Sequence, residues 1–260
     1  MKRGQVTAFV IVGIVLLMAV ILLLYFILRT PQAGVEQRAE ETVISPGADA
    51  IKFYIDDCMK QSGEKAVVHV SVRGGYYEVI GYHVSYKDIN IPYYFYEGQK
   101  DMPVRDDIKN ELEKAFKNYA SECLIGLETF IEQGYMINEK GNVTITASIL
   151  ENNVFFDVNM PLEVIKNEET FNYNKFNANI KIPLNKMINL TEKFAVFQAE
   201  NPDALKLSHL IDLSLENNIY TEIIRQEEGD VIFYMMDNTT IINDKPYGFA
   251  FAVKYTEVEI

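Results

Sequence analysis

Residues 143–182 read VTITASILENNVFFDVNMPLEVIKNEETFNYNKFNANIKI, and their apolar side chains recur with a period of two. This alternation is typical of strands that bury one face of a sheet. It predicts a hairpin of strands 143–150 and 154–164, followed by a third strand at 170–182. The apolar residues of the third strand change phase part of the way along, so we expect a β-bulge near Lys175.

Helices and further strands are predicted on both sides of this stretch. Helical periodicity predicts helices at 48–62, 103–131, 184–200 and 202–215, and alternation predicts strands at 76–80, 91–96, 219–226, 231–237 and 248–258. Residues 64–73 fit either a strand or a second helix. Strands separated by helices favour an α+β fold of helices and antiparallel β meanders, with a possible subdivision near residue 135.

The N-terminal residues 6–28, VTAFVIVGIVLLMAVILLLYFIL, carry no charge. As a helix they would reach roughly 34 Å at ~1.5 Å per residue, enough to cross a hydrocarbon core of about 30 Å. A cleaved secretory signal would have a shorter apolar run, of about 7–15 residues. Lys2 and Arg3 precede the run and acidic residues follow Arg29, so the N-terminus is expected in the cytoplasm. The resulting divisions are a basic leader at 1–5, a transmembrane helix at 6–28, a stalk at 29–47 and an extracytoplasmic α+β domain at 48–260.

The start Lys2-Arg3-Gly4-Gln5, followed at once by the apolar run, resembles the class III signal peptides of archaeal type IV pilin-like proteins. The resemblance implies peptidase cleavage between Gly4 and Gln5. The rest of the chain, with Gly74-Gly75-Tyr76, the 91–98 segment and its two cysteines, is similar to uncharacterised archaeal single-pass membrane proteins that share this N-terminus. That similarity implies a single-pass membrane topology. It implies no activity, because none is assigned to those proteins.

In an exported chain the two cysteines, Cys58 and Cys123, are candidates for a disulfide. They lie on the apolar faces of two expected helices. A bridge would staple these helices face to face and close a loop of about 65 residues, a stabilisation of roughly 4 kcal/mol in the chain-entropy model. The alternative is a pair of buried thiols. Sequons at Asn142, Asn189 and Asn238 are candidates for N-glycosylation in an exported chain.

Residues 76–96 are unusually rich in tyrosine, with Tyr76, Tyr77, Tyr82, Tyr86, Tyr93, Tyr94 and Tyr96 in one short stretch. Tyrosine rings offer contact area with a polar tip, so this stretch is a candidate binding surface. The alternative is a half-buried sheet whose tyrosines cover the core.

Recognised chemical motifs do not occur in the sequence. His69, His83 and His209 are isolated, and there is no HExxH pattern, nucleophile elbow, phosphate loop, GxGxxG or EF-hand loop. We therefore predict no metal site, no cofactor and no catalytic residue. The formal net charge of −13 repels phosphate backbones, so nucleic acid is not an expected partner.

These patterns favour a cell-membrane protein whose extracellular domain binds or scaffolds without catalysis. Its expected partners are the lipid bilayer and other envelope proteins or copies of itself. One alternative is a pilin-like structural subunit. The others are a domain that captures a small ligand or a cell-wall fragment, and a hydrolase whose residues converge only on folding.

Overall fold

The computed structural model describes Met18 and residues 46–200, 205, 207–226 and 229–254. The expected leader, the transmembrane helix apart from Met18, and nearly all of the stalk lie outside these residues. In the described part of the chain, no helix is both long enough and apolar enough to cross a membrane. Ser45–Ile260 form one compact unit.

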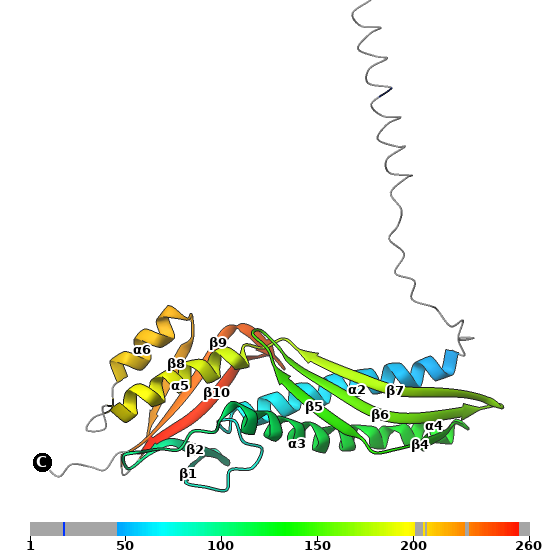
Figure 1. Cartoon of the computed structure of the whole chain (residues 1–260), viewed down its shortest axis with the longest axis horizontal. Coiled ribbons are helices and arrows are strands. Elements are labelled where there is room, and N and C mark those ends of the chain that lie inside the picture. Colours follow the sequence, from blue (N-terminus) through cyan, green and yellow to red (C-terminus); the bar gives the residue numbers. More distant parts are fainter. Residues whose placement is uncertain (1–17, 19–45, 201–204, 206, 227–228, 255–260) are drawn as a thin grey trace, which may run out of the picture. The chain divides into compact units, whose positions relative to one another are not determined.

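This unit is α+β, as the sequence predicts (Figure 1). Its helices are α2 (Pro46–Ser71), α3 (Arg105–Leu124), the 3-10 turn η1 (Ile125–Leu127), α4 (Glu128–Glu132), α5 (Leu184–Glu200) and α6 (Leu207–Glu216). Its strands are β1 (His83–Tyr86), β2 (Ile89–Tyr96), β3 (Gln99–Lys100), β4 (Met136–Glu139), β5 (Thr144–Ile149), β6 (Val154–Lys166), β7 (Glu169–Ile180), β8 (Tyr220–Arg225), β9 (Asp230–Ile242) and β10 (Lys245–Lys254).

The predicted hairpin and its neighbour form a four-stranded antiparallel sheet around the long strand β6. β7 pairs along one side of β6, while β5 and β4 share the other side. The bulge expected near Lys175 is confirmed, because Asn159 pairs with Lys175 but Leu162 pairs with Tyr173. The extra residue lies on β6 and not on β7. Pro161 is there, and a proline without an N–H leaves the ladder at little cost.

The other strands form a six-stranded sheet in the order β1-β2-β10-β9-β8, with β3 also paired to β2. β2 and β10 run parallel, which corrects the expectation of purely antiparallel meanders. β9 and β10 are joined at Asn243 and Asp244, both at positive φ, as in the type I′ turns that match strand twist. This tight hairpin was not predicted from the sequence.

The helices α2 and α3 pack against each other and against the four-stranded sheet, α2 on β7 and α3 on β5 (Figure 1). α5 packs on the six-stranded sheet, where Phe194 lies 5.4 Å from Phe233 between ring centroids. Buried residues from both sheets belong to one continuous core. The change of sequence pattern near residue 135 therefore marks a change of sheet within one compact unit.

Two sequence expectations about α2 and its surroundings are wrong. α2 does not end near Gly63 but continues to Ser71, so most of 64–73 is helix. Gly63 faces β7 so closely that a Cβ there would lie 3.0 Å from the Cδ1 atom of Ile180, which makes it a packing glycine and not a stop signal. The helix ends instead before Gly74 and Gly75, both at positive φ, and no strand forms at 76–80.

Candidate functional site

Cys58 of α2 and Cys123 of α3 form the expected disulfide, with their Cα atoms 5.8 Å apart. The hydroxyl of Tyr54 donates a hydrogen bond to the carbonyl oxygen of Cys123 at 2.7 Å. Gly126 permits this approach, because a Cβ at that position would overlap the Tyr54 hydroxyl. The pair α2 and α3 is therefore held both by a covalent bond and by close packing.

Three of the seven tyrosines of the expected surface lie away from the others. Tyr94 is fully buried, and its hydroxyl donates to the carbonyl oxygen of Gly74 at 2.8 Å. Tyr76 and Tyr77 follow the end of α2 and lie near α3, where the backbone N–H of Tyr77 donates to Glu111 at 2.9 Å. Burial, assisted by nearby carboxylates, raises the pKa of Tyr76 to about 12, so its phenol is neutral.

The other four tyrosines gather on one face of the six-stranded sheet. Tyr82 stacks on Tyr96 with ring centroids 4.3 Å apart, and Tyr93 lies 5.2 Å from Tyr96. Tyr86 packs on the same apolar cluster. We call this the outer face; its residues are Val84, Tyr86, Ile89, Ile91, Tyr93, Tyr96, Ile224, Ile232, Tyr234, Ala250 and Ala252.

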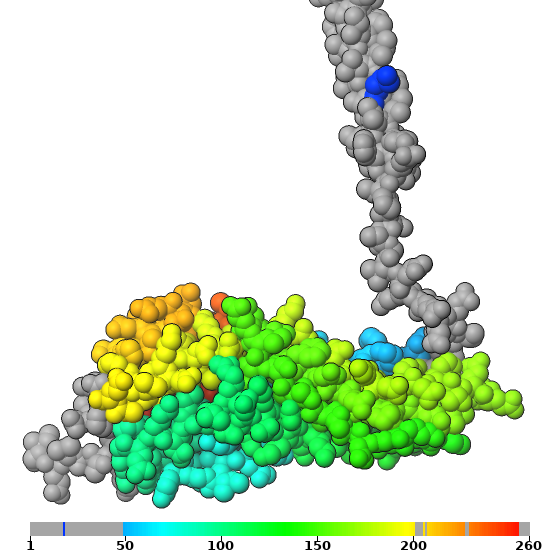
Figure 2. Space-filling view, in the orientation of Figure 1, coloured from blue at the N-terminus to red at the C-terminus, as the bar shows by residue number. Residues whose placement is uncertain are grey.

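The outer face is the side of the six-stranded sheet opposite α5. Ile232 and Ala252 alternate along β9 and β10 with Phe233 and Phe251, and the latter two rings contact Phe194 of α5. In the space-filling view, atoms of α5 and α6 hide most of β10 on the α5 side (Figure 2). The sheet thus has one face covered by helices and a second face rich in tyrosine and isoleucine.

An apolar groove of about 400 Å³ opens on the outer face, where β1, β2, β8, β9 and β10 meet the end of α2. It is lined by Val72, Tyr86, Ile89, Ile91, Ile224, Ile232, Tyr234 and Ala250, with Lys87, Glu222 and Lys245 as its charged residues. Its size and its mainly apolar lining, with few polar groups, are typical of ligand-binding pockets. We call it the apolar groove.

Tyr234 forms one wall of the groove because of a glycine on the neighbouring strand. Its ring lies over Gly248, where any Cβ would overlap the ring and its hydroxyl. Burial raises the pKa of Tyr234, and the carboxylate of Glu222 raises it further, so the phenol remains a neutral donor. Tyr234 and Gly248 are not among the site residues predicted from the sequence, although the alternation of the predicted strand 231–237 places Tyr234 beside Ile232 on one face.

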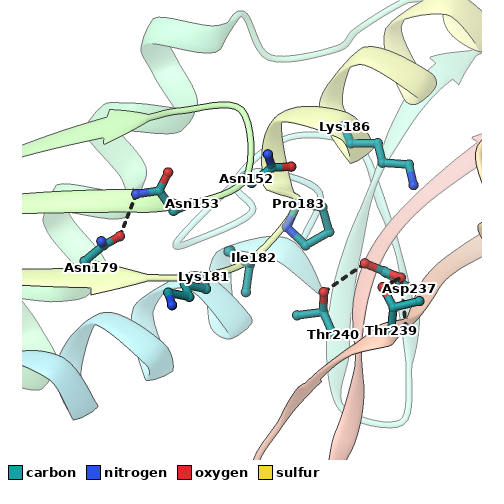
Figure 3. Close-up of a pocket in the computed structure, with 10 residues that line it drawn as sticks. All are labelled: Asn152, Asn153, Asn179, Lys181, Ile182, Pro183, Lys186, Asp237, Thr239 and Thr240. Atoms are coloured by element: carbon teal, nitrogen blue, oxygen red, sulfur yellow. Dashed lines mark hydrogen bonds between the residues drawn. The ribbon is translucent and has the colours of Figure 1, made fainter. Parts of the chain in front are cut away.

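A second hollow, of about 610 Å³, lies where the two sheets adjoin (Figure 3). We call it the polar hollow, and it is lined by Asn152, Asn153, Asn179, Lys181, Ile182, Pro183, Lys186, Asp237, Thr239 and Thr240. Figure 3 shows the asparagines on one side and Asp237 with its threonines on the other. The lining suits a polar ligand, in contrast to the apolar groove.

The three histidines lie in separate environments. His69 bonds through Nδ1 to the Tyr119 hydroxyl and through Nε2 to the Tyr77 carbonyl, and burial lowers the pKa of its ring. His83 bonds to a nearby carbonyl, and His209 stacks on Phe197. Across the described residues, no group of three or more His, Cys, Asp or Glu side chains is placed to hold a metal ion.

The three sequons differ in their surroundings. Asn142 and Asn238 are exposed and lie outside the helices. Asn189 is exposed on α5, but its amide oxygen accepts a hydrogen bond from Arg105 at 2.7 Å. Its sequon partner Thr191 is buried and donates to carbonyls of the preceding helical turn. Asn142, whose Thr144 is also exposed, is therefore the best placed for modification, because the Thr240 hydroxyl of the Asn238 sequon donates to Asp237.

Comparison with known proteins finds no matching family model, no matching curated protein and no matching solved structure.

Proposed function

We propose that this chain is a membrane-anchored surface protein whose extracytoplasmic domain binds a partner through the apolar groove, without catalysis. The uncharged run at 6–28 and its basic flank support an anchor with the N-terminus inside. The Cys58–Cys123 bridge supports an oxidising compartment, since such bonds are rare in reducing cytosol. The partner is another envelope protein or a second copy of the chain.

The observation that carries this proposal is the apolar groove itself. Three isoleucines from three strands, Ile91, Ile224 and Ile232, contribute to its lining. A partner's aromatic side chain buries roughly 150–250 Å² and would gain about 4–6 kcal/mol there before the costs of association. Lys87 and Lys245 outnumber Glu222 at the groove, and this excess of positive charge favours an apolar segment flanked by acidic residues.

Substitution Ile224→Asp tests the groove by placing a charge among its apolar residues. The matched control is Ile131→Asp on α4, where the isoleucine is 52% exposed and does not line the groove. Both full-length variants are expressed in native membranes, cross-linked, and purified for quantitative mass spectrometry. We expect one specific partner to be cross-linked to wild type and to the Ile131 variant in similar amounts. The amount of this partner recovered with the Ile224 variant should be at least tenfold lower. Equal recovery by both variants, with unchanged melting temperatures, would contradict a role for the groove.

The location of the domain is tested separately, by the intact mass of protein extracted from native membranes with thiol labelling before and after reduction. We expect no free thiol until reduction. Two free cysteines in the native protein would contradict export. A mass without the first four residues would show leader cleavage at Gly4 and would strengthen the pilin-like alternative.

A further inference from the structure

One wall of the polar hollow is a bulge in the β9–β10 hairpin. Asp237 pairs with Tyr247 and Ile241 pairs with Pro246, so 238–240 have no partners on β10. The bulge presents Thr239 and Thr240 to the hollow. Bulges that redirect side chains in this way are frequent next to functional sites.

Asp237 holds the bulge in shape and is only 5% exposed. Its Oδ1 atom accepts hydrogen bonds from the backbone N–H of Thr239 at 3.0 Å and from its hydroxyl at 2.6 Å, and Oδ2 accepts from the Thr240 hydroxyl at 2.9 Å. Burial alone would raise the pKa of Asp237, but these hydrogen bonds and the nearby charge of Lys186 lower it below its usual value. The carboxylate is therefore ionised, and its oxygens are occupied by its own loop.

Two cations line the hollow, Lys181 before α5 and Lys186 in the first turn of α5 (Figure 3). Neither lysine forms an ion pair with another described residue. Both ammonium groups therefore keep donors for a ligand. The hollow thus carries more positive than negative charge on a chain whose formal net charge is −13.

Amide groups line the side of the hollow opposite Asp237 and its threonines. The Nδ2 atom of Asn153 donates to the Oδ1 atom of Asn179 at 2.5 Å, which fixes both side chains (Figure 3). This leaves the Oδ1 atom of Asn153, the Nδ2 group of Asn179 and the side-chain amide of Asn152 for other partners. Mixed donors and acceptors match hydroxyl groups, which both donate and accept.

We infer that the polar hollow binds an acidic saccharide, with its carboxylate or phosphate near Lys186, with Lys181 adding positive charge on the asparagine side, and with its hydroxyls on the asparagines and threonines. The lysines select the charge, and the amides distinguish a hydroxylated anion from a simple inorganic one. Three segments, 152–153, 179–186 and 237–240, build the hollow from both sheets. This site is separate from the apolar groove and does not depend on the groove's function.

The test is calorimetric titration of the full-length protein in a detergent without a sugar head group. The probes are glucuronic acid, glucose 6-phosphate, glucose and inorganic phosphate. We expect at least one acidic sugar to bind about tenfold or more tightly than both glucose and inorganic phosphate, and the tighter of the two acidic sugars identifies the preferred charged group. If neither acidic sugar exceeds glucose and inorganic phosphate in this way, the inference is overturned.

Variants locate the binding. Lys186→Gln should weaken the acidic sugar about tenfold, and Lys181→Gln with Lys186→Gln together should weaken it further. The matched control is Lys193→Gln, an exposed lysine of the same helix that does not line the hollow. Unchanged affinity in the double variant, or an equal loss in the control, would refute a site at this hollow. Melting temperatures of all variants establish that they remain folded.

Discussion

Reduction of the Cys58–Cys123 bridge should destabilise the domain by an amount that follows from the loop it closes. The cysteines are 65 residues apart in sequence. In the chain-entropy model a loop of this length contributes about 4 kcal/mol at 25 °C, because the bridge restricts the unfolded chain. Reduction removes no side chain from the core, and the hydrogen bond from Tyr54 to the Cys123 carbonyl does not involve the bridge. The reduced domain should therefore remain folded but melt about 8–16 °C lower, at roughly 2–4 °C per kcal/mol for a domain of this size.

The assay is urea unfolding of the full-length protein, followed by circular dichroism, with and without reductant. A loss of about 4 kcal/mol should lower the midpoint by roughly 1.5 M if the urea dependence is about 2.5–3 kcal/mol per M. A Cys58→Ala, Cys123→Ala double variant is the control, and reductant should not change its midpoint. If reduction costs the wild type less than about 1 kcal/mol, the loop-entropy reasoning fails for this protein.

Three further perturbations have definite expected outcomes. Gly126→Ala should cost about 1–3 kcal/mol by forcing its Cβ against the Tyr54 hydroxyl, and Tyr54→Phe in that background should recover part of the loss in urea unfolding. Tyr94→Phe should cost about 1–3 kcal/mol by leaving the Gly74 carbonyl without its buried donor, as a thermal melt of the two proteins would measure. Asp237 has a lowered folded pKa, so its stabilisation is present above its unfolded value of 3.8 and is lost as pH falls through the lower folded value. The stability difference between wild type and Asp237→Asn should accordingly shrink between pH 7 and pH 3, and a constant difference would contradict this.

Local periodicity was sufficient to predict most elements of the fold. The alternation in 143–182 predicted three of the four strands of the smaller sheet, and helical spacing predicted α5 within its observed bounds. Gly63 misled the prediction of α2, because a glycine chosen for close contact with β7 has the same local signature as a helix stop. The parallel pairing of β2 with β10 joins segments far apart in sequence, and no local pattern encodes it.

The candidate sites were less accessible to sequence reasoning than the fold. Tyrosine density identified Tyr86 of the apolar groove, yet the same stretch contains Tyr94, which is a core residue. Composition cannot separate these two, since Tyr86 lies on β1 and Tyr94 on β2, and the pairing of each strand decides which way its ring faces. The polar hollow draws residues from three distant segments, and its lysines and asparagines are common surface residues until the fold brings them together.

The β9–β10 hairpin carries residues of both sites that were not predicted from the sequence. The predicted strand ends at Asp237, and three polar residues, 238–240, follow it. Such an interruption looks the same in sequence whether the strand stops or bulges, and only the register with β10 shows that pairing resumes at Ile241. The supposed loop therefore contains the threonines of the polar hollow, and directly after the Asn243 and Asp244 turn it contains Lys245 of the apolar groove. Where a strand pattern breaks and polar residues follow, a bulge with a binding role is thus a structural alternative to a loop, and the pairing register decides between them.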